Sequence, residues 1–233
     1  MMWEIPKMWE GGECWIIGGG GSMPRQFGVP EEIIDGVYAK QLPMSVYSPY
    51  LSAIHNKHVI GVNMAFELGN WVDLCIFGDG GFYFKNREAL LAFPRLRVSC
   101  NPNLVKKDAV GVKHVLRDGR KPDGISTRPN HLSWNRNTGG AAINLAVQMG
   151  VKKIYLLGFD MNLDEKQRQH WHSKYPTANR GGAVDPRRLP FKRHLASFPA
   201  IARDAKVLGI EIINVNPKSA IPQFPRVSLK DVL

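Results

Sequence analysis

Two histidines stand two residues apart in the segment His170-Trp171-His172, and they are the side chains of this sequence best suited to acid–base chemistry. An imidazole titrates near neutral pH and therefore serves as a general acid or base. The pair could also begin a zinc site, but no further Cys or His stands at the usual ligand spacing. A packed or exposed pair without a chemical role is the alternative. Trp171 and Tyr175 can stack on a base or sugar, or anchor the segment.

A run of four glycines, Gly18, Gly19, Gly20 and Gly21, follows an apolar stretch and leads into Ser22. Backbone N–H groups of such a turn can approach a phosphate closely, and a serine hydroxyl adds one more donor. The turn lacks the Gly-Lys-Ser/Thr ending of a P-loop, and Met23 stands where the dinucleotide fingerprint needs a glycine. We therefore expect phosphate contact at this turn, with an ordinary chain reversal as the alternative.

A second glycine-containing turn, Thr138-Gly139-Gly140, precedes the clearest helical pattern, at residues 140–149. Helix N-termini carry unpaired N–H groups and the positive end of the helix dipole. Thr138 can cap this helix and contact an anion at the same time. An ordinary N-cap with small residues for close packing is the alternative.

Short polar side chains follow four apolar runs, at the points where strands are expected to end. They are Asn63, Asp79, Asn101 and Asp160. Each could be a turn residue that bonds its own backbone. Together they predict a rim that faces a nucleotide, and Asp79 or Asp160 would hold Mg²⁺ if the chemistry needs it.

The elements that position these residues alternate between strands and helices. Strands are expected at residues 14–18, 58–63, 72–79, 96–101, 112–117, 153–160 and 211–216, and helices at 87–93, 140–149 and 191–208. Several strands are almost continuously apolar, which is typical of parallel strands covered on both faces. The pattern predicts an α/β fold: a three-layer, mostly parallel Rossmann-like sheet with helices on both faces.

Residues 162–190 break this rhythm with basic side chains, glycines and prolines, and they follow the carboxyl end of a strand. Open α/β sheets bind ligands at that edge, and long loops in compact domains are usually functional or disordered. We expect a lid insertion here. Lys174 and Arg180 within it, together with Arg136, are candidate phosphate-binding cations.

Composition narrows the class of protein. A chain of 233 residues predicts a single domain, residues 1–233, and a net charge of +11 favours anionic ligands or partners. No apolar run approaches the roughly 18 residues that span a membrane. The acid-containing N-terminus does not resemble a signal peptide, and three cysteines in apolar surroundings indicate a reducing compartment. These features predict a cytoplasmic protein.

The assembled motifs resemble those of family-42 sialyltransferases and of the 6-hydroxymethylpterin diphosphokinase-like group, which includes many bacteriophage proteins. The resemblance rests on Gly18–Ser22, Asn63, Thr138-Gly139, IYLLGFD at residues 154–160, His172-Ser173-Lys174 and Asn216-Pro217-Lys218-Ser219. It implies a phage-encoded chain in the host cytoplasm, a nucleotide held by the glycine turn and Asn63, and His172 or His170 as general base.

The predicted function is that of a transferase with a nucleotide-activated donor, a glycosyltransferase that uses a CMP- or UDP-sugar. The excess positive charge suits a polyanionic acceptor such as DNA or lipopolysaccharide. Two alternatives remain open: an ATP- and Mg²⁺-dependent diphosphokinase of the hydroxymethylpterin type, and a nucleotide- or nucleic-acid-binding protein without catalysis.

Overall fold

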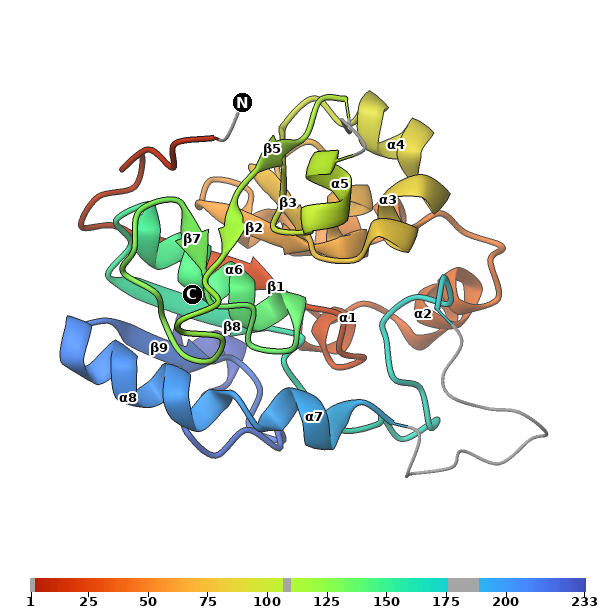
Figure 1. Ribbon diagram of the computed structural model, residues 1–233. Coiled ribbons are helices and arrows are strands. Elements are labelled where there is room, and N and C mark those ends of the chain that lie inside the picture. The colour runs from red at the N-terminus through yellow and green to blue at the C-terminus, as the bar shows by residue number, and fades with distance from the viewer. Residues whose placement is uncertain (1–2, 107–109, 176–188) are drawn as a thin grey trace.

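Seven strands pair in parallel into one sheet, in the order β5-β4-β3-β2-β1-β8-β9 (Figure 1). This computed structural model describes residues 3–106, 110–175 and 189–233. The strands are β1 (Glu13–Ile17), β2 (Val59–Val62), β3 (Leu74–Phe77), β4 (Leu96–Ser99), β5 (Lys113–His114), β8 (Lys153–Leu157) and β9 (Glu211–Asn214). The chain builds outward from β1 to β5 and then crosses to the other side of β1, so the strand order reverses between β1 and β8. The predicted α/β sheet is confirmed.

Side chains alternate between the two faces of the sheet and form a core on each. In β1, Cys14 and Ile16 join the cluster under α6 (Thr138–Gln148) and α8 (Phe198–Leu208). Trp15 and Ile17 join the opposite cluster. That second cluster is covered by α1 (Met23–Gln26), α2 (Glu31–Tyr38), η1 (Met44–Ile54), η2 (Asn63–Leu68), α3 (Gly80–Lys85), α4 (Arg87–Ala92) and α5 (Pro102–Lys106). Helices therefore cover both faces, as Figure 1 shows.

Helix α6 begins at Thr138, two residues before the predicted start, and the cap is not the expected one. Asn137 is the N-cap, and its side chain accepts a hydrogen bond from the Gly140 N–H at 2.6 Å. The prediction that Thr138 caps the helix is wrong, because Thr138 already lies in the first turn. The helix ends before Gly150, whose φ of 94° is the left-handed conformation expected of a terminating glycine.

Two expected elements are each divided in the structure. The strand at 112–117 becomes β5 and β6 (Leu116–Arg117), and β6 pairs with β7 (His131–Leu132) in a separate two-stranded sheet. The helix at 191–208 becomes α7 (Phe191–Leu195) and α8, with Pro199 in the first turn of α8. Proline lacks an N–H and its ring clashes with the preceding helical turn, so it favours a break between the two helices at this position.

The remaining element is η4 (Leu229–Asp231), close to the C-terminus. Within the described ranges, no helix has the length and apolar character that crossing a membrane requires.

Candidate functional site

A cavity of about 580 Å³ opens at the carboxyl-terminal edge of the sheet, across the point where the strand order reverses. Ligands of open α/β sheets bind at such points, since the loops of neighbouring strands diverge there. Many residues selected from the sequence line the cavity: Gly18, Gly19, Gly20, Asn63, Asp79, Asn101, Arg136, Thr138, Gly139, Asp160, His170, His172 and Tyr175. Gly21, Ser22, Gly140 and Lys174 are not among the lining residues. Arg180 and residues 176–188 of the expected lid lie outside the described residues.

The glycine run packs against the segment that follows β8. A Cβ atom on Gly18 would stand 2.7 Å from the carbonyl oxygen of Gly158, and one on Gly20 would stand 2.5 Å from the Asp160 carboxylate. The Gly20 N–H donates to the Gly158 carbonyl at 2.8 Å. These glycines are therefore required by close contact within the protein, in addition to any role toward a ligand.

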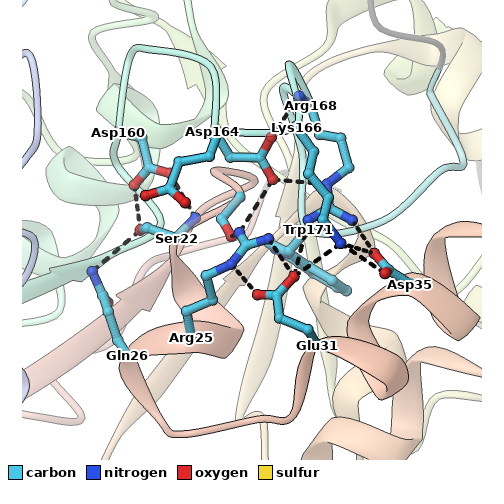
Figure 2. A network of polar contacts seen from close by, with 12 residues as sticks. Ser22, Arg25, Gln26, Glu31, Asp35, Asp160, Asp164, Lys166, Arg168 and Trp171 are labelled. Carbon is cyan, nitrogen blue, oxygen red and sulfur yellow. Dashed lines mark hydrogen bonds and ion pairs between the residues drawn. The ribbon is translucent and has the colours of Figure 1, made fainter.

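The carboxylate of Asp160 accepts hydrogen bonds from the Ser22 donors that were expected to bind a phosphate. The Ser22 N–H and hydroxyl donate to the Asp160 carboxylate at 2.8 and 2.6 Å (Figure 2). The Asn216 amide also donates to this carboxylate, at 2.8 Å. Burial raises the pKa of Asp160, while the hydrogen bonds from Ser22 and Asn216 oppose that rise. Because its carboxylate oxygens accept these three hydrogen bonds, Asp160 stabilises the turn at Ser22.

The four predicted rim residues differ in how much of their side chain is available. Asp79 caps α3 by accepting from the Gly81 N–H, and Asn101 bonds the Asn103 N–H and the Gly78 carbonyl. The Asn63 amide has no hydrogen bond to any residue that the structure describes, although it lines the cavity. Asn63 is therefore the rim residue best placed to contact a ligand.

Backbone strain accompanies the cavity lining. Asn63, Arg136 and Met161 line the cavity and have φ values of 53°, 56° and 53°. Side chains other than glycine seldom occupy this left-handed region, although asparagine tolerates it best. Such residues persist where the surroundings impose the conformation, and they cluster at functional sites.

The two histidines lie side by side with opposite hydrogen-bonding roles. Their rings are 5.3 Å apart and nearly parallel, and Tyr175 lies edge-on to both. His170 Nδ1 is 3.3 Å from the Gly19 carbonyl, which can only accept, so this nitrogen carries the hydrogen and Nε2 keeps its lone pair. His172 Nδ1 accepts the Lys174 N–H at 3.3 Å, so its hydrogen is on Nε2.

Burial keeps both rings neutral. It lowers the pKa of His170 to about 4, and the hydrogen bond to the Gly19 carbonyl opposes this by raising the pKa. It lowers the pKa of His172 well below the usual value, and the neighbouring His170 and Lys174 add to that shift. A neutral His170 whose Nε2 has no hydrogen-bond partner among the described residues has the form of a general base, whereas the neutral His172 presents a donor.

The lining residues that were not selected from the sequence include Arg117, Trp134 and His194. The Arg117 guanidinium lies 4.1 Å from the Trp134 ring centroid and donates to the carbonyls of Cys100 and Gly78. His194, on α7, has its pKa lowered to about 4 by burial and then by the neighbouring Arg193. The sequence signals for these residues were a basic segment around His194 and the position of Arg117 at the end of the strand expected at 112–117; no pattern in the sequence singled out Trp134.

Charge in the cavity is mainly positive. Arg117, Arg136 and Arg193 line it together with the carboxylates of Asp79 and Asp160. Arg136 pairs with Asp123 at 3.1 Å and remains more than half exposed. Among the described residues, no cluster of three or more His, Cys, Asp or Glu side chains could hold a metal ion.

Comparison with known proteins finds no matching protein-family model and no matching curated protein. Several solved structures do match. The MAf glycosyltransferase of Magnetospirillum magneticum AMB-1 has a TM-score of 0.60 at 12% identity, over 100% of this chain and 36% of its own. The present chain thus corresponds to about a third of that protein. The likeness concerns the fold.

Two sialyltransferases of Campylobacter jejuni also match, with lower TM-scores. CstII in complex with cytidine-5'-monophosphate has a TM-score of 0.48 at 14% identity, over 93% of this chain and 84% of its own. An α-2,3-sialyltransferase in apo form has a TM-score of 0.47 at 14% identity, over 98% and 85% of the two chains.

Proposed function

We propose that this chain is a glycosyltransferase that uses a nucleotide-activated sugar. The observation that carries the proposal is His170, a partly buried imidazole whose Nδ1 is held by the Gly19 carbonyl and whose Nε2 has no hydrogen-bond partner among the described residues. It lines a cavity at the reversal point of a parallel sheet, together with three arginines. A fold shared with the MAf glycosyltransferase is compatible with this activity.

His170 would take the proton of an acceptor hydroxyl on Nε2. The hydroxyl oxygen would form the new bond to the anomeric carbon, and the bond from that carbon to the phosphate oxygen would break, with its electron pair remaining on the phosphate. Arg117, Arg136 and Arg193 would stabilise the charge that develops on the departing phosphate. A phosphate in the cavity would also raise the pKa of His170 from about 4, because a nearby anion favours the imidazolium.

Asn63 is our candidate for recognition of the nucleotide, since its amide lines the cavity without a described protein partner. His172 would orient the donor or acceptor through its Nε2–H. The net charge of +11 favours an anionic acceptor, and the sequence resemblance to family-42 sialyltransferases makes a CMP-sugar the first donor to test.

A two-part experiment tests the proposal. In the first part, thermal shift is measured with CMP, UDP, GDP and ADP sugars, and with ATP and pterins in Mg²⁺. A ligand of the folded state raises the melting temperature, and we expect a CMP- or UDP-sugar to do so in the wild type but not in Asn63→Ala. Stabilisation by ATP and Mg²⁺ alone would instead support the diphosphokinase alternative.

In the second part, donor turnover is compared between wild type, His170→Ala and His172→Ala. Loss of a general base costs roughly 10²–10⁴-fold in rate, so His170→Ala should fall by that factor while nucleotide affinity stays the same. Undiminished turnover in His170→Ala would reject the assignment.

A further inference from the structure

A cluster of six charged side chains joins the segment that carries His170 to residues 25–35 (Figure 2). Its members are Arg25, Glu31, Asp35, Asp164, Lys166 and Arg168. Three are acidic and three are basic, so the cluster carries no net charge. It lies outside the cavity, since none of its members lines that space.

Arg168 and Asp164 are the buried centre of this cluster. Their side chains are only 7% and 6% exposed, whereas those of Glu31, Asp35 and Lys166 are about half exposed. Arg168 Nε donates to Asp164 at 2.7 Å, and its backbone N–H donates to the same carboxylate at 2.7 Å. Arg168 Nη1 reaches Asp35 on α2 at 2.9 Å, and the guanidinium lies 5.1 Å from the Tyr38 ring centroid.

Arg25 connects the same carboxylate to the glycine turn. Its Nη1 donates to Asp164 at 3.1 Å and to the Gly21 carbonyl at 3.2 Å, and its other nitrogens bind Glu31. Asp164 therefore joins the segment after β8 to α1 and to the glycine turn. Replacing either arginine would leave a buried carboxylate with fewer donors, which is costly.

His170 and His172 stand two and four residues after Arg168, and hydrogen bonds to the glycine turn hold this segment in place. His170 forms an isolated antiparallel bridge with Gly20, and the Trp171 N–H donates to the Gly19 carbonyl at 3.1 Å. The Trp171 indole N–H donates to the Gly18 carbonyl at 2.8 Å, with the ring 1% exposed. The Gly19 carbonyl that receives Trp171 is the one that orients His170 Nδ1. Any shift of the segment would disturb both contacts.

We infer that Arg168, acting through Asp164 and Asp35, is a positioning residue that fixes His170 in the orientation required of a general base. This rests on the proposed function for its catalytic meaning, but its geometric claim can be tested without any substrate. A lysine cannot replace Arg168 fully, because a single ammonium cannot bind Asp164 and Asp35 with the planar fork of a guanidinium.

The test is a histidine-resolved NMR titration of the full chain with ¹⁵N-labelled imidazoles. In the wild type we expect His170 as the Nδ1–H tautomer with a pKa near 4. In Arg168→Ala its pKa should rise by about one unit or more toward the ordinary value of about 6.5, because the ring loses its burial, and the tautomer should become mixed. Arg168→Lys should move in the same direction by less.

Two controls separate positioning from general loosening. Lys166→Ala removes a cation from the same cluster that bonds Asp35 and Glu31 but not Asp164, and it should leave His170 unchanged. His194 lines the same cavity from α7, and its pKa is lowered mainly by its own burial and by Arg193, with a smaller contribution from His170. Its pKa should therefore shift by much less than that of His170 in all variants. A shift that is largely confined to His170 supports the inference. The inference is overturned if the pKa of His170 is unchanged in folded Arg168→Ala, or in Arg168→Lys if the alanine variant does not fold. It is also overturned if the pKa of His194 shifts by as much as that of His170.

Once a sugar donor is known, kinetic measurements test the catalytic part of the inference. Arg168→Ala should lower kcat by roughly 10–100-fold, since small misplacements of a reacting group cost about 10²-fold, with nucleotide Kd nearly unchanged. If the wild type transfers no sugar, the proposed function fails while the NMR result on His170 still stands or falls independently.

Discussion

Replacing Gly20 with alanine tests whether the glycine run serves packing or only a ligand. The added Cβ would stand 2.5 Å from two atoms of the Asp160 carboxyl group and 2.7 Å from the Gly158 carbonyl oxygen. Both neighbours are fixed: Asp160 by Ser22 and Asn216, and Gly158 by the Gly20 N–H. Neither can withdraw without breaking a buried hydrogen bond.

The expected loss of stability follows from these contacts. Overpacking costs about 1–3 kcal/mol, and a buried polar group left without its partner costs about 1–3 kcal/mol more. Alanine offsets about 0.4–1 kcal/mol of this by restricting the unfolded chain. We therefore expect Gly20→Ala to lower the free energy of unfolding by roughly 2–4 kcal/mol, and the melting temperature by about 4–16 °C.

Urea unfolding of the ligand-free protein measures this loss, with Gly119→Ala as the matched control. A Cβ on Gly119 meets nothing within 4 Å, and its φ is not in the left-handed region, so that variant should be neutral or slightly more stable. Equal unfolding midpoints for the two variants would refute the packing argument. Weaker nucleotide binding by a Gly20→Ala protein of unchanged stability would mean that the turn serves the ligand alone.

Two further predictions concern the pH dependence of stability and the buried amide of Asn144 on α6. Burial places the pKa of His170 near 4 in the folded protein and the unfolded value is about 6.5, so the unfolded chain binds the proton first and stability is lost as pH falls from about 6.5 to 4. In urea titrations the wild type should lose on the order of 3 kcal/mol more over this pH range than His170→Gln does; parallel pH profiles of the two proteins would contradict the prediction. Asn144→Ala should cost roughly 2–4 kcal/mol in urea unfolding, because the buried amide accepts from the Ser126 and Ser133 N–H groups and donates to the Ser126 carbonyl. A decrease of less than about 0.5 kcal/mol in the free energy of unfolding of Asn144→Ala would contradict this second prediction.

Hydrophobic pattern alone was sufficient for the sheet. Strands such as residues 153–157 are apolar on both faces because each face is covered by helices, so continuous apolar runs mark them in the sequence. The polar residues that end these strands could be located by the same argument, since parallel strands bring their carboxyl ends to one edge. The sequence pattern did not predict the order of the strands in the sheet or the reversal of that order between β1 and β8.

Side-chain partners were beyond the reach of the sequence. Asp160 and Asn63 both follow a strand, and the sequence does not distinguish them. In the structure the Asp160 carboxylate accepts hydrogen bonds from Ser22 and Asn216, whereas the Asn63 side chain has no hydrogen bond to a described residue, although both residues line the cavity. Trp134 and Arg117 reach the cavity only because β6 and β7 pair beside the main sheet. Local spacing carries no information about such tertiary contacts.

The position of Asp160 also bears on where a phosphate would bind. Its carboxylate already receives the Ser22 N–H and hydroxyl, so these donors serve an anion that belongs to the protein. A phosphate brought to the same point would meet like charge in a buried setting, where repulsion is poorly screened. We therefore expect its favourable contacts toward the first turn of α6, beside Thr138 and Gly139, and toward the arginines that line the cavity. The glycine turn would then act on the reaction chiefly through the Gly19 carbonyl, which holds His170 in place.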